Sequence, residues 1–416
     1  MSHPVSSLNK GLGAFNEPIQ IEDVPTLGWN LLREELSLPS AVLYQDRIEH
    51  NLDWMRRFVE AYGAKLCPHG KTTMAPALFR RQIEAGAWGI TLATAQQARV
   101  AHKHGIMRIL LANQLVGHQN LQIVSDMLKD PELEFFCLID HPDHVRLMGE
   151  FFGERGQSIS VFVEVGADGG RAGIRSLNQI DAIVQAQKEF SNSVFIIGVE
   201  LFEGIFKEET EVRTFLRSAI EAAKQLVAKG AVQRTPLLLS GAGSAWFDVV
   251  AEVFSAAAVD VEFEVILRPG CYLTHDCGSY SGPQSRMLKS SEVVRSLGEG
   301  LLPSLHIWAY VQSIPEPGYA IVGFGKRDAS FDSGLPIPTL QFRPGTKAPN
   351  DAPAHWAVTK MMDQHAYLSI QPGDDLHIGD MIAFNISHPC LTFDKWRYVA
   401  VVDREFTVVE LVETYF

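Results

Sequence analysis

Short apolar segments alternate with helical segments over most of the chain. The β-rich segments are 65–69, 88–93, 108–112, 134–140, 160–165, 194–200, 235–240 and 262–267. Between them lie segments with helical periodicity, such as 94–104 and 209–229. Eight strands that alternate with helices over about 200 residues are typical of a (β/α)8 barrel. We therefore expect an α/β barrel domain over residues 45–295.

The pattern changes near residue 300. Apolar runs at 304–313, 318–322, 380–386 and 397–411 are separated by turn-rich stretches and lack long helical partners, which predicts a β domain over 300–416. The stretch 324–355 is rich in Pro, Gly and Asp and is expected to be a loop. The early run 40–44 precedes the first barrel helix. We expect residues 1–44 to contribute a strand to the C-terminal sheet.

Charge and cysteine content exclude several classes of protein. The chain has 36 Lys and Arg against 49 Asp and Glu, a net charge of −13, which argues against a nucleic acid or an anionic membrane as partner. No apolar run reaches the length of a membrane span. The five cysteines are scattered and odd in number, and the N-terminus lacks an apolar secretory region. A cytoplasmic protein is expected.

Lys71 follows the first predicted strand within the sequence LCPHGKTTMAP. Chemistry in a barrel sits at the carboxyl ends of the strands, so this lysine is either a solvated surface residue or an amine held in a pocket. A lone lysine is usually exposed. The residues after two other predicted strands favour the second possibility, in which Lys71 is held in a pocket.

Strands seven and eight end in LSGAGSAWF and LRPGCY. Gly241, Gly243, Ser244, Gly270 and Cys271 follow these strands, where barrels commonly bind phosphate through free backbone N–H groups. The glycines alone would also fit tight turns. A pocket lysine opposite a phosphate site is what pyridoxal phosphate requires, with the lysine forming the Schiff base.

Two arginines are candidates for contacts with the cofactor ring. Arg171 follows the Gly-rich end of strand five in VEVGADGGRAGIR and is predicted to meet the phenolate oxygen, unless it is a surface residue. Arg268 is predicted to meet the ring nitrogen. Tyr272, in the same stretch as Arg268, completes the candidate cofactor-binding residues.

His388 and Cys390 lie two residues apart in FNISHPCLTFDKWR. On an extended segment they point to the same side, and an imidazole with a thiolate forms half of a zinc site. A buried cysteine beside a hydrogen-bonded histidine is the more common structural explanation of such a pair. Asp363, Gln364 and His365 are candidates for further ligands or for residues that support the ligands.

The combined motifs resemble the metal-dependent fold-type III pyridoxal phosphate enzymes, the group that contains D-serine dehydratase, D-threonine aldolase and D-threo-3-hydroxyaspartate dehydratase. The resemblance runs from about residue 38 to the C-terminus and includes LPSAVLYQDRIEHNL, PHGKT, VEVGADGGRAGI, GAGS, LRPGCY and SHPC. It implies that Lys71 forms the Schiff base. It also implies an alanine-racemase-like barrel, a second β domain and a homodimer.

The resemblance also suggests a reaction. By this resemblance, dehydratases of the group carry the motif H-x-C and aldolases carry H-x-D. This chain has His388-Pro389-Cys390. The expected activity is dehydration of a D-3-hydroxy amino acid such as D-serine or D-threonine to a 2-oxo acid and ammonia. Lys71 would be the general base, and zinc, or another divalent ion such as manganese, would act on the β-hydroxyl. The alternatives are retro-aldol cleavage, an amino-acid racemase and a non-catalytic pyridoxal phosphate-binding protein.

Overall fold

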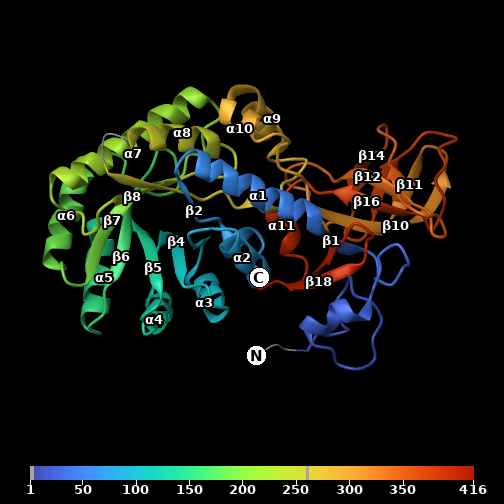
Figure 1. The fold of residues 1–416 in the computed structure, drawn as a ribbon, viewed down its shortest axis with the longest axis horizontal. Coiled ribbons are helices and arrows are strands. Elements are labelled where there is room, and N and C mark those ends of the chain that lie inside the picture. Colours follow the sequence, from blue (N-terminus) through green and yellow to red (C-terminus); the bar gives the residue numbers. More distant parts are fainter. Residues whose placement is uncertain (1–3, 259–261) are drawn as a thin grey trace.

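The computed structural model describes residues 4–258 and 262–416. Residues 1–3 of the predicted N-terminal contribution and residues 259–261 of the predicted barrel domain lie outside the described residues. A barrel of strands and helices lies beside a β domain (Figure 1). Helix α1 (Gln45–Ala61) leads from strand β1 (Ser40–Tyr44) in the β domain to the barrel.

The barrel is built from eight parallel strands in the spatial order β2-β9-β8-β7-β6-β5-β4-β3. They are β2 (Lys65–Leu66), β3 (Ile90–Leu92), β4 (Arg108–Gln114), β5 (Glu134–Ile139), β6 (Ile159–Val165), β7 (Val194–Leu201), β8 (Leu237–Gly241) and β9 (Phe263–Leu267). A bridge between His69 and Thr91, together with the bond from the Trp88 N–H to the Leu66 carbonyl, joins the two end strands. The sheet therefore curls back on itself, and all eight predicted strands are confirmed.

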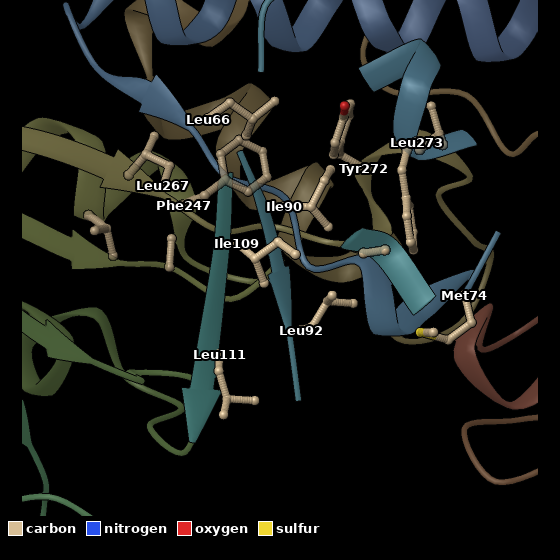
Figure 2. Packing of buried hydrophobic residues seen from close by; sticks show 14 of the residues in the cluster. Leu66, Met74, Ile90, Leu92, Ile109, Leu111, Phe247, Leu267, Tyr272 and Leu273 are labelled. Carbon is tan, nitrogen blue, oxygen red and sulfur yellow. The ribbon is translucent and has the colours of Figure 1, made fainter. Parts of the chain in front are cut away.

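Alternate residues of each strand face opposite sides of the sheet. Leu110 and Leu138 belong to a small buried cluster made by inward-facing residues of the strands. Their neighbours Ile109 and Leu111 belong to the large cluster between the strands and the helices. Figure 2 shows this outer layer around Ile109, Leu111 and Tyr272. The continuous apolar character of the strands follows from burial on both faces.

Helices connect and follow the strands. They are α2 (Pro76–Glu84), α3 (Ala95–Lys103), α4 (His118–Met127), α5 (Pro142–Gly153), α6 (Gln179–Glu189), α7 (Glu209–Ala228), α8 (Phe247–Ala257), α9 (Ser281–Ser290) and α10 (Glu292–Ser296). Local signals fix their starts: the Thr94 side chain accepts the Gln97 N–H, and prolines occupy the first positions of α2 and α5. Within the described residues, no helix is long and apolar enough to cross a membrane.

The β domain contains the predicted C-terminal strands and β1. Its other strands are β10 (Leu305–Glu316), β11 (Tyr319–Val322), β12 (Ile337–Phe342), β13 (Asn350–Asp351), β14 (Ala357–Met361), β15 (Ala366–Ser369), β16 (Met381–Asn385), β17 (Tyr398–Val402) and β18 (Val408–Glu413). Strand β1 pairs antiparallel with β10 and parallel with β17, which confirms the expectation for residues 40–44.

The expectation that 324–355 is entirely loop is wrong, because this stretch contains β12 and β13. The register of β12 against β16 shifts between Pro338 and Leu340. A strand tolerates proline at such an irregularity, where a ladder hydrogen bond is missing. The Pro-rich composition therefore concealed a strand.

The β domain also extends to the mouth of the barrel. Strand β16 is followed by the short helix α11 (Cys390–Phe393), which contacts the 3-10 turn η2 (Gly70–Thr72) after β2. The N–H groups of Cys277 and Ser279 bond to the carbonyls of Ile386 and Ser387. These contacts hold the segment 386–390 over the carboxyl ends of the barrel strands.

Candidate active site

A cavity of about 260 Å³ lies at the carboxyl ends of the barrel strands, beneath the segment that carries Cys390. Its lining comprises His69, Lys71, Thr72, Ala93, Ala112, Asn113, Arg171, Phe202, Gly204, Ala242, Gly243, Ser244, Ala245, Arg268, Gly270, Cys271, Tyr280 and Cys390. A larger cavity of about 370 Å³, which includes Arg80 and His104, lies near α2 and β18. It contains none of the predicted site residues.

Lys71 stands at this cavity in the turn η2, and its side chain reaches solvent. Partial burial lowers the pKa of its ammonium group, the Cys390 thiolate opposes this effect, and Arg171 adds to it. Among the described residues, no hydrogen bond or ion pair of Lys71 is found. An amine with a lowered pKa and no fixed partner is suited to covalent attachment and to proton transfer.

Both predicted arginines line the cavity, but Arg268 is buried and paired whereas Arg171 is exposed. Arg268 is 4% exposed, pairs with Glu200, and donates to the Ser240 hydroxyl at 3.0 Å and the Leu201 carbonyl at 2.8 Å. Arg171 is exposed, and its guanidinium lies 5.8 Å from the centre of the Phe202 ring. Arg268 is thus fixed in place, while Arg171 remains available to a ligand.

Two buried carboxyl groups lie near the carboxyl ends of neighbouring barrel strands. Glu164 and Glu200 are the second-to-last residues of β6 and β7, and burial raises the pKa of both, that of Glu164 to about 7. Gln114 donates to Glu164. Sequence reasoning missed these groups, although an acidic residue near the end of each of two neighbouring barrel strands is a usable signal.

The loop after β8 is held by a third buried carboxylate. Glu203 accepts the N–H of Ala242 at 3.2 Å and the N–H of Gly243 at 2.8 Å. Ala242 has φ +82°, a strained backbone conformation for a residue with a side chain. Glu203 therefore pins the loop and occupies the Gly243 N–H that was predicted to bind phosphate.

Other donors of the predicted phosphate site stay open. In the described structure, the N–H groups of Ser244 and Gly270 donate no hydrogen bond, and the Cys271 N–H donates to the Ser244 hydroxyl at 3.1 Å. Helix α8 begins three residues after Ser244. Together with the amine of Lys71 and the free guanidinium of Arg171, these donors fit the phosphate and ring oxygen of pyridoxal phosphate.

Two predicted cofactor-binding residues lie away from the cavity. Gly241 is buried in β8, where an added Cβ would meet Phe254 and Val250 of α8. The Tyr272 hydroxyl accepts from Gln82, and its ring packs in the hydrophobic layer seen in Figure 2. Neither side chain lines the cavity.

His388 and Cys390 interact with each other, although Cys390 begins a helix and the segment is not extended. Nδ1 of His388 is 2.7 Å from Oδ2 of Asp332. The sulfur of Cys390 is 4.0 Å from that of Cys271 and 3.5 Å from the Thr72 hydroxyl. The H-x-C pair therefore meets a second cysteine from the loop after β9.

The side chains in this cluster shift one another's pKa values. A hydrogen bond from Cys271, together with His388 and Thr72, lowers the pKa of Cys390 to about 4 against the opposing effect of burial. The Cys390 thiolate and Asp332 raise the pKa of His388 to about 9. A metal ion binds thiolate and neutral imidazole, so any metal bound by this pair would displace the proton shared between them.

The proposed extra ligands do not join this pair. Asp363, Gln364 and His365 lie between β14 and β15, where Gln364 donates to Asp328 at 3.5 Å. No hydrogen bond or ion pair in the described chain links them to His388 or Cys390. Across residues 4–258 and 262–416, no group of three or more His, Cys, Asp or Glu side chains is assembled for a metal ion.

Sequence reasoning also missed Asp332, Asp276 and Tyr280. Asp332 lies in the stretch expected to be loop, and nothing local marks it as a partner of His388. Asp276 and Tyr280 follow LRPGCY within the same connection, and Tyr280 lines the cavity. Their closeness to a strand end was the available signal.

Comparison with known families assigns both parts of the chain. The family described as "Alanine racemase, N-terminal domain" matches residues 43–274, more than half of the chain. The family described as "Putative serine dehydratase domain" matches residues 304–402. These ranges correspond to the barrel and to the β domain.

Curated relatives cover different shares of the chain. The D-threonine aldolase of Arthrobacter sp. is 24% identical over 385 residues, which is 90% of this chain and 91% of that protein. The D-threo-3-hydroxyaspartate dehydratase of Delftia sp. (strain HT23) is 30% identical over 139 residues, 33% of this chain and 36% of that protein.

Solved structures share the fold. D-threonine aldolase from Filomicrobium marinum has a TM-score of 0.75 at 22% identity, covering 93% of this chain and 97% of that one. A cysteine-to-alanine variant of D-threo-3-hydroxyaspartate dehydratase, described as metal-free, has a TM-score of 0.71 at 19% identity, covering 93% and 99%. The chain belongs to the fold-type III pyridoxal phosphate enzymes, with a barrel of the alanine racemase N-terminal family followed by a serine-dehydratase-type β domain.

Proposed function

We propose that this protein is a pyridoxal phosphate- and metal-dependent dehydratase of D-3-hydroxy amino acids such as D-serine or D-threonine. The products would be a 2-oxo acid and ammonia. One observation carries the proposal: Lys71 and Cys390 line the same cavity. An amine suited to the cofactor and a thiolate suited to a soft metal therefore face one substrate-sized space.

The residues of the chain have separable tasks in this proposal. Lys71 anchors the cofactor and, once free, takes the proton from Cα, for which its lowered pKa is suited. Ser244 and Gly270 offer open N–H groups to the phosphate, the Cys271 N–H holds the Ser244 hydroxyl beside them, and Arg171 offers a cation to the ring oxygen. Pyridoxal phosphate, when bound, supplies the electron sink at Cα.

His388 and Cys390 would hold zinc or another divalent ion. When bound there, the metal would act as a Lewis acid on the β-hydroxyl, which is a poor leaving group. Asp332 orients the imidazole through Nδ1, as carboxylates commonly do for histidine ligands. Lys71 and this pair would then act on neighbouring carbons of one substrate.

Retro-aldol cleavage is the second candidate. It is favoured by the D-threonine aldolase of Arthrobacter sp., which matches 90% of this chain, against 33% for the dehydratase. The cysteine in His388-Pro389-Cys390 favours dehydration, since the resemblance associates H-x-C with dehydratases. An aldolase would remove the hydroxyl proton and break the Cα–Cβ bond.

Product analysis separates the two reactions. The purified enzyme, loaded with pyridoxal phosphate, should be incubated with D- and L-serine and D- and L-threonine, with and without a chelator. A dehydratase releases ammonia and a 2-oxo acid from the D-forms and stops when the metal is removed. Glycine and an aldehyde would instead establish the aldolase, and full ammonia release from verified metal-free enzyme would exclude the role given to the metal.

A further inference from the structure

We propose that Cys271 is a second thiolate ligand of the metal held by His388 and Cys390, which gives a ligand set of two cysteines and one histidine. This inference rests on the proposed function, because it concerns the same metal. Cys271 was predicted only as a backbone donor to phosphate, and its N–H does point to Ser244. Its side chain has a different neighbour, the sulfur of Cys390.

The distance between the two sulfur atoms supports a shared metal. They are 4.0 Å apart. Two thiolates bound tetrahedrally to zinc at about 2.3 Å are separated by about 3.8 Å. Metal binding would therefore require the sulfurs to move by only a few tenths of an ångström. Both cysteines also line the cavity, so the metal would lie close to the substrate.

Asp332 supports His388 as a third ligand. Asp332 contacts its Nδ1 at 2.7 Å, which leaves Nε2 for a metal. Cys390 lies two residues from His388 in the chain, and its sulfur is 4.0 Å from that of Cys271. Cys390 is therefore the central residue, with Cys271 and His388 as its two neighbours.

A buried carboxylate nearby is only partly compensated: Oδ1 of Asp276 accepts the N–H groups of Gly278 and Tyr280 at 2.8 and 3.0 Å. Asp276 is 1% exposed, and its Oδ2 has no hydrogen-bond partner in the described residues. It is close enough to Cys271, Cys390 and His388 to interact with them electrostatically. A thiolate and an unsatisfied carboxylate in one buried region favour a bound cation.

The three ligands do not yet surround one point. Closing the set requires the His388 ring to move toward the two sulfurs, which already have nearly the required spacing, and side chains move between staggered positions at low cost. The Cys271 sulfur would form a bond to the metal, and its proton would pass to solvent. Three protein ligands leave the fourth position open to a substrate hydroxyl, as in catalytic zinc sites.

Cobalt substitution tests the ligand count directly. Holoenzyme containing pyridoxal phosphate would be freed of its metal and titrated with Co²⁺. The sulfur-to-cobalt charge-transfer absorption reports thiolate ligands independently of activity. Two thiolates are expected in the wild type, so Cys271→Ser and Cys390→Ser should each lose about half of this absorption. Zinc affinity should fall at least about tenfold in Cys271→Ser.

Cys277→Ser is the matched control. Cys277 lies in the same connection, but its sulfur donates to the backbone carbonyls of Asn385 and Ile386, which a serine can also reach. This variant should keep the full cobalt absorption. If Cys271→Ser fails to fold, protection of the wild type replaces it: zinc should protect Cys271 and Cys390, but not Cys277, from alkylation mapped by mass spectrometry.

The outcomes separate this inference from the proposed function. Full cobalt absorption in Cys271→Ser, or alkylation of Cys271 in the zinc-loaded wild type, would overturn the second thiolate while leaving His388 and Cys390 as ligands. Wild-type protein without thiolate–cobalt absorption would overturn both. Absorption that is halved in Cys271→Ser and unchanged in Cys277→Ser would establish Cys271 as a ligand.

Discussion

Replacing Glu200 with Gln should destabilise the barrel by about 3 kcal/mol, because the buried Arg268 guanidinium would lose its negative partner. Glu200 is 2% exposed and Arg268 is 4% exposed. Breaking such a pair costs about 3–5 kcal/mol. We expect the lower end of this energy range because Arg268 keeps its hydrogen-bond acceptors on Ser240 and Leu201. At about 2 °C per kcal/mol, the Tm of the barrel should fall by about 6 °C.

Arg268→Met removes the other partner of this pair. The loss of stability that it causes should depend on pH. Glutamate can take up a proton, whereas arginine cannot lose one under these conditions. Burial already raises the pKa of Glu200, and removing Arg268 raises it further. A folded-state pKa above the unfolded value of about 4.3 means that stability is lost as the pH rises. Arg268→Met should therefore have a larger Tm deficit at pH 8 than at pH 5.

Differential scanning calorimetry at both pH values checks these expectations. Glu200→Gln removes the titrating group, whereas the wild type, with its raised Glu200 pKa, loses stability as the pH rises, so the deficit of this variant should be no larger at pH 8 than at pH 5. The double variant Glu200→Leu/Arg268→Met should recover most of the loss, because apolar replacement of both partners removes the unpaired charge. The reasoning is refuted if Glu200→Gln stays within about 2 °C of the wild type, or if the double variant shows the sum of the single losses.

Lys71→Ala should abolish the visible absorption of bound cofactor and its borohydride-stable link to the chain, and a link that survives the substitution would exclude Lys71. Gly243→Val should weaken pyridoxal phosphate binding about tenfold in equilibrium dialysis, because its Cβ would lie 2.9 Å from the Phe202 ring and displace the loop; unchanged affinity would contradict the loop assignment. In metal-free protein, alkylation of Cys390 by iodoacetamide should keep a constant rate from pH 5 to pH 8, because the Cys271 hydrogen bond and His388 hold its pKa at about 4. A rate that rises about tenfold per pH unit would show an ordinary thiol.

The barrel could be predicted because its strands are buried on both faces. Segments such as 194–200 are then continuous apolar runs, which stand out between amphipathic helices. The strand over 40–44 was predicted for the same reason. The strand β12 was missed because Pro338 and its flanking residues have the composition of a loop, and only its pairing with β16 makes it a strand.

Residues of the site could be predicted where a strand end marks them. Lys71, Ser244 and Gly270 each follow a barrel strand, and all three line the cavity. Tyr272 shares such a position but packs outward, because the backbone turns through η3 (Cys271–Leu273) after Gly270. Adjacency to a strand end thus identifies the region of the site, while the direction of each side chain depends on the local turn.

The contact between Cys271 and Cys390 illustrates what a single sequence leaves out. The two residues are 119 positions apart and belong to different domains. Their sulfurs meet only because 386–390 is hydrogen-bonded to the connection after β9, through Cys277 and Ser279. The H-x-C spacing predicts a pair of ligands, but the proposed third ligand depends on this domain contact. Residues that complete a site between two domains are therefore the least visible in sequence, even when each one lies within a recognised motif.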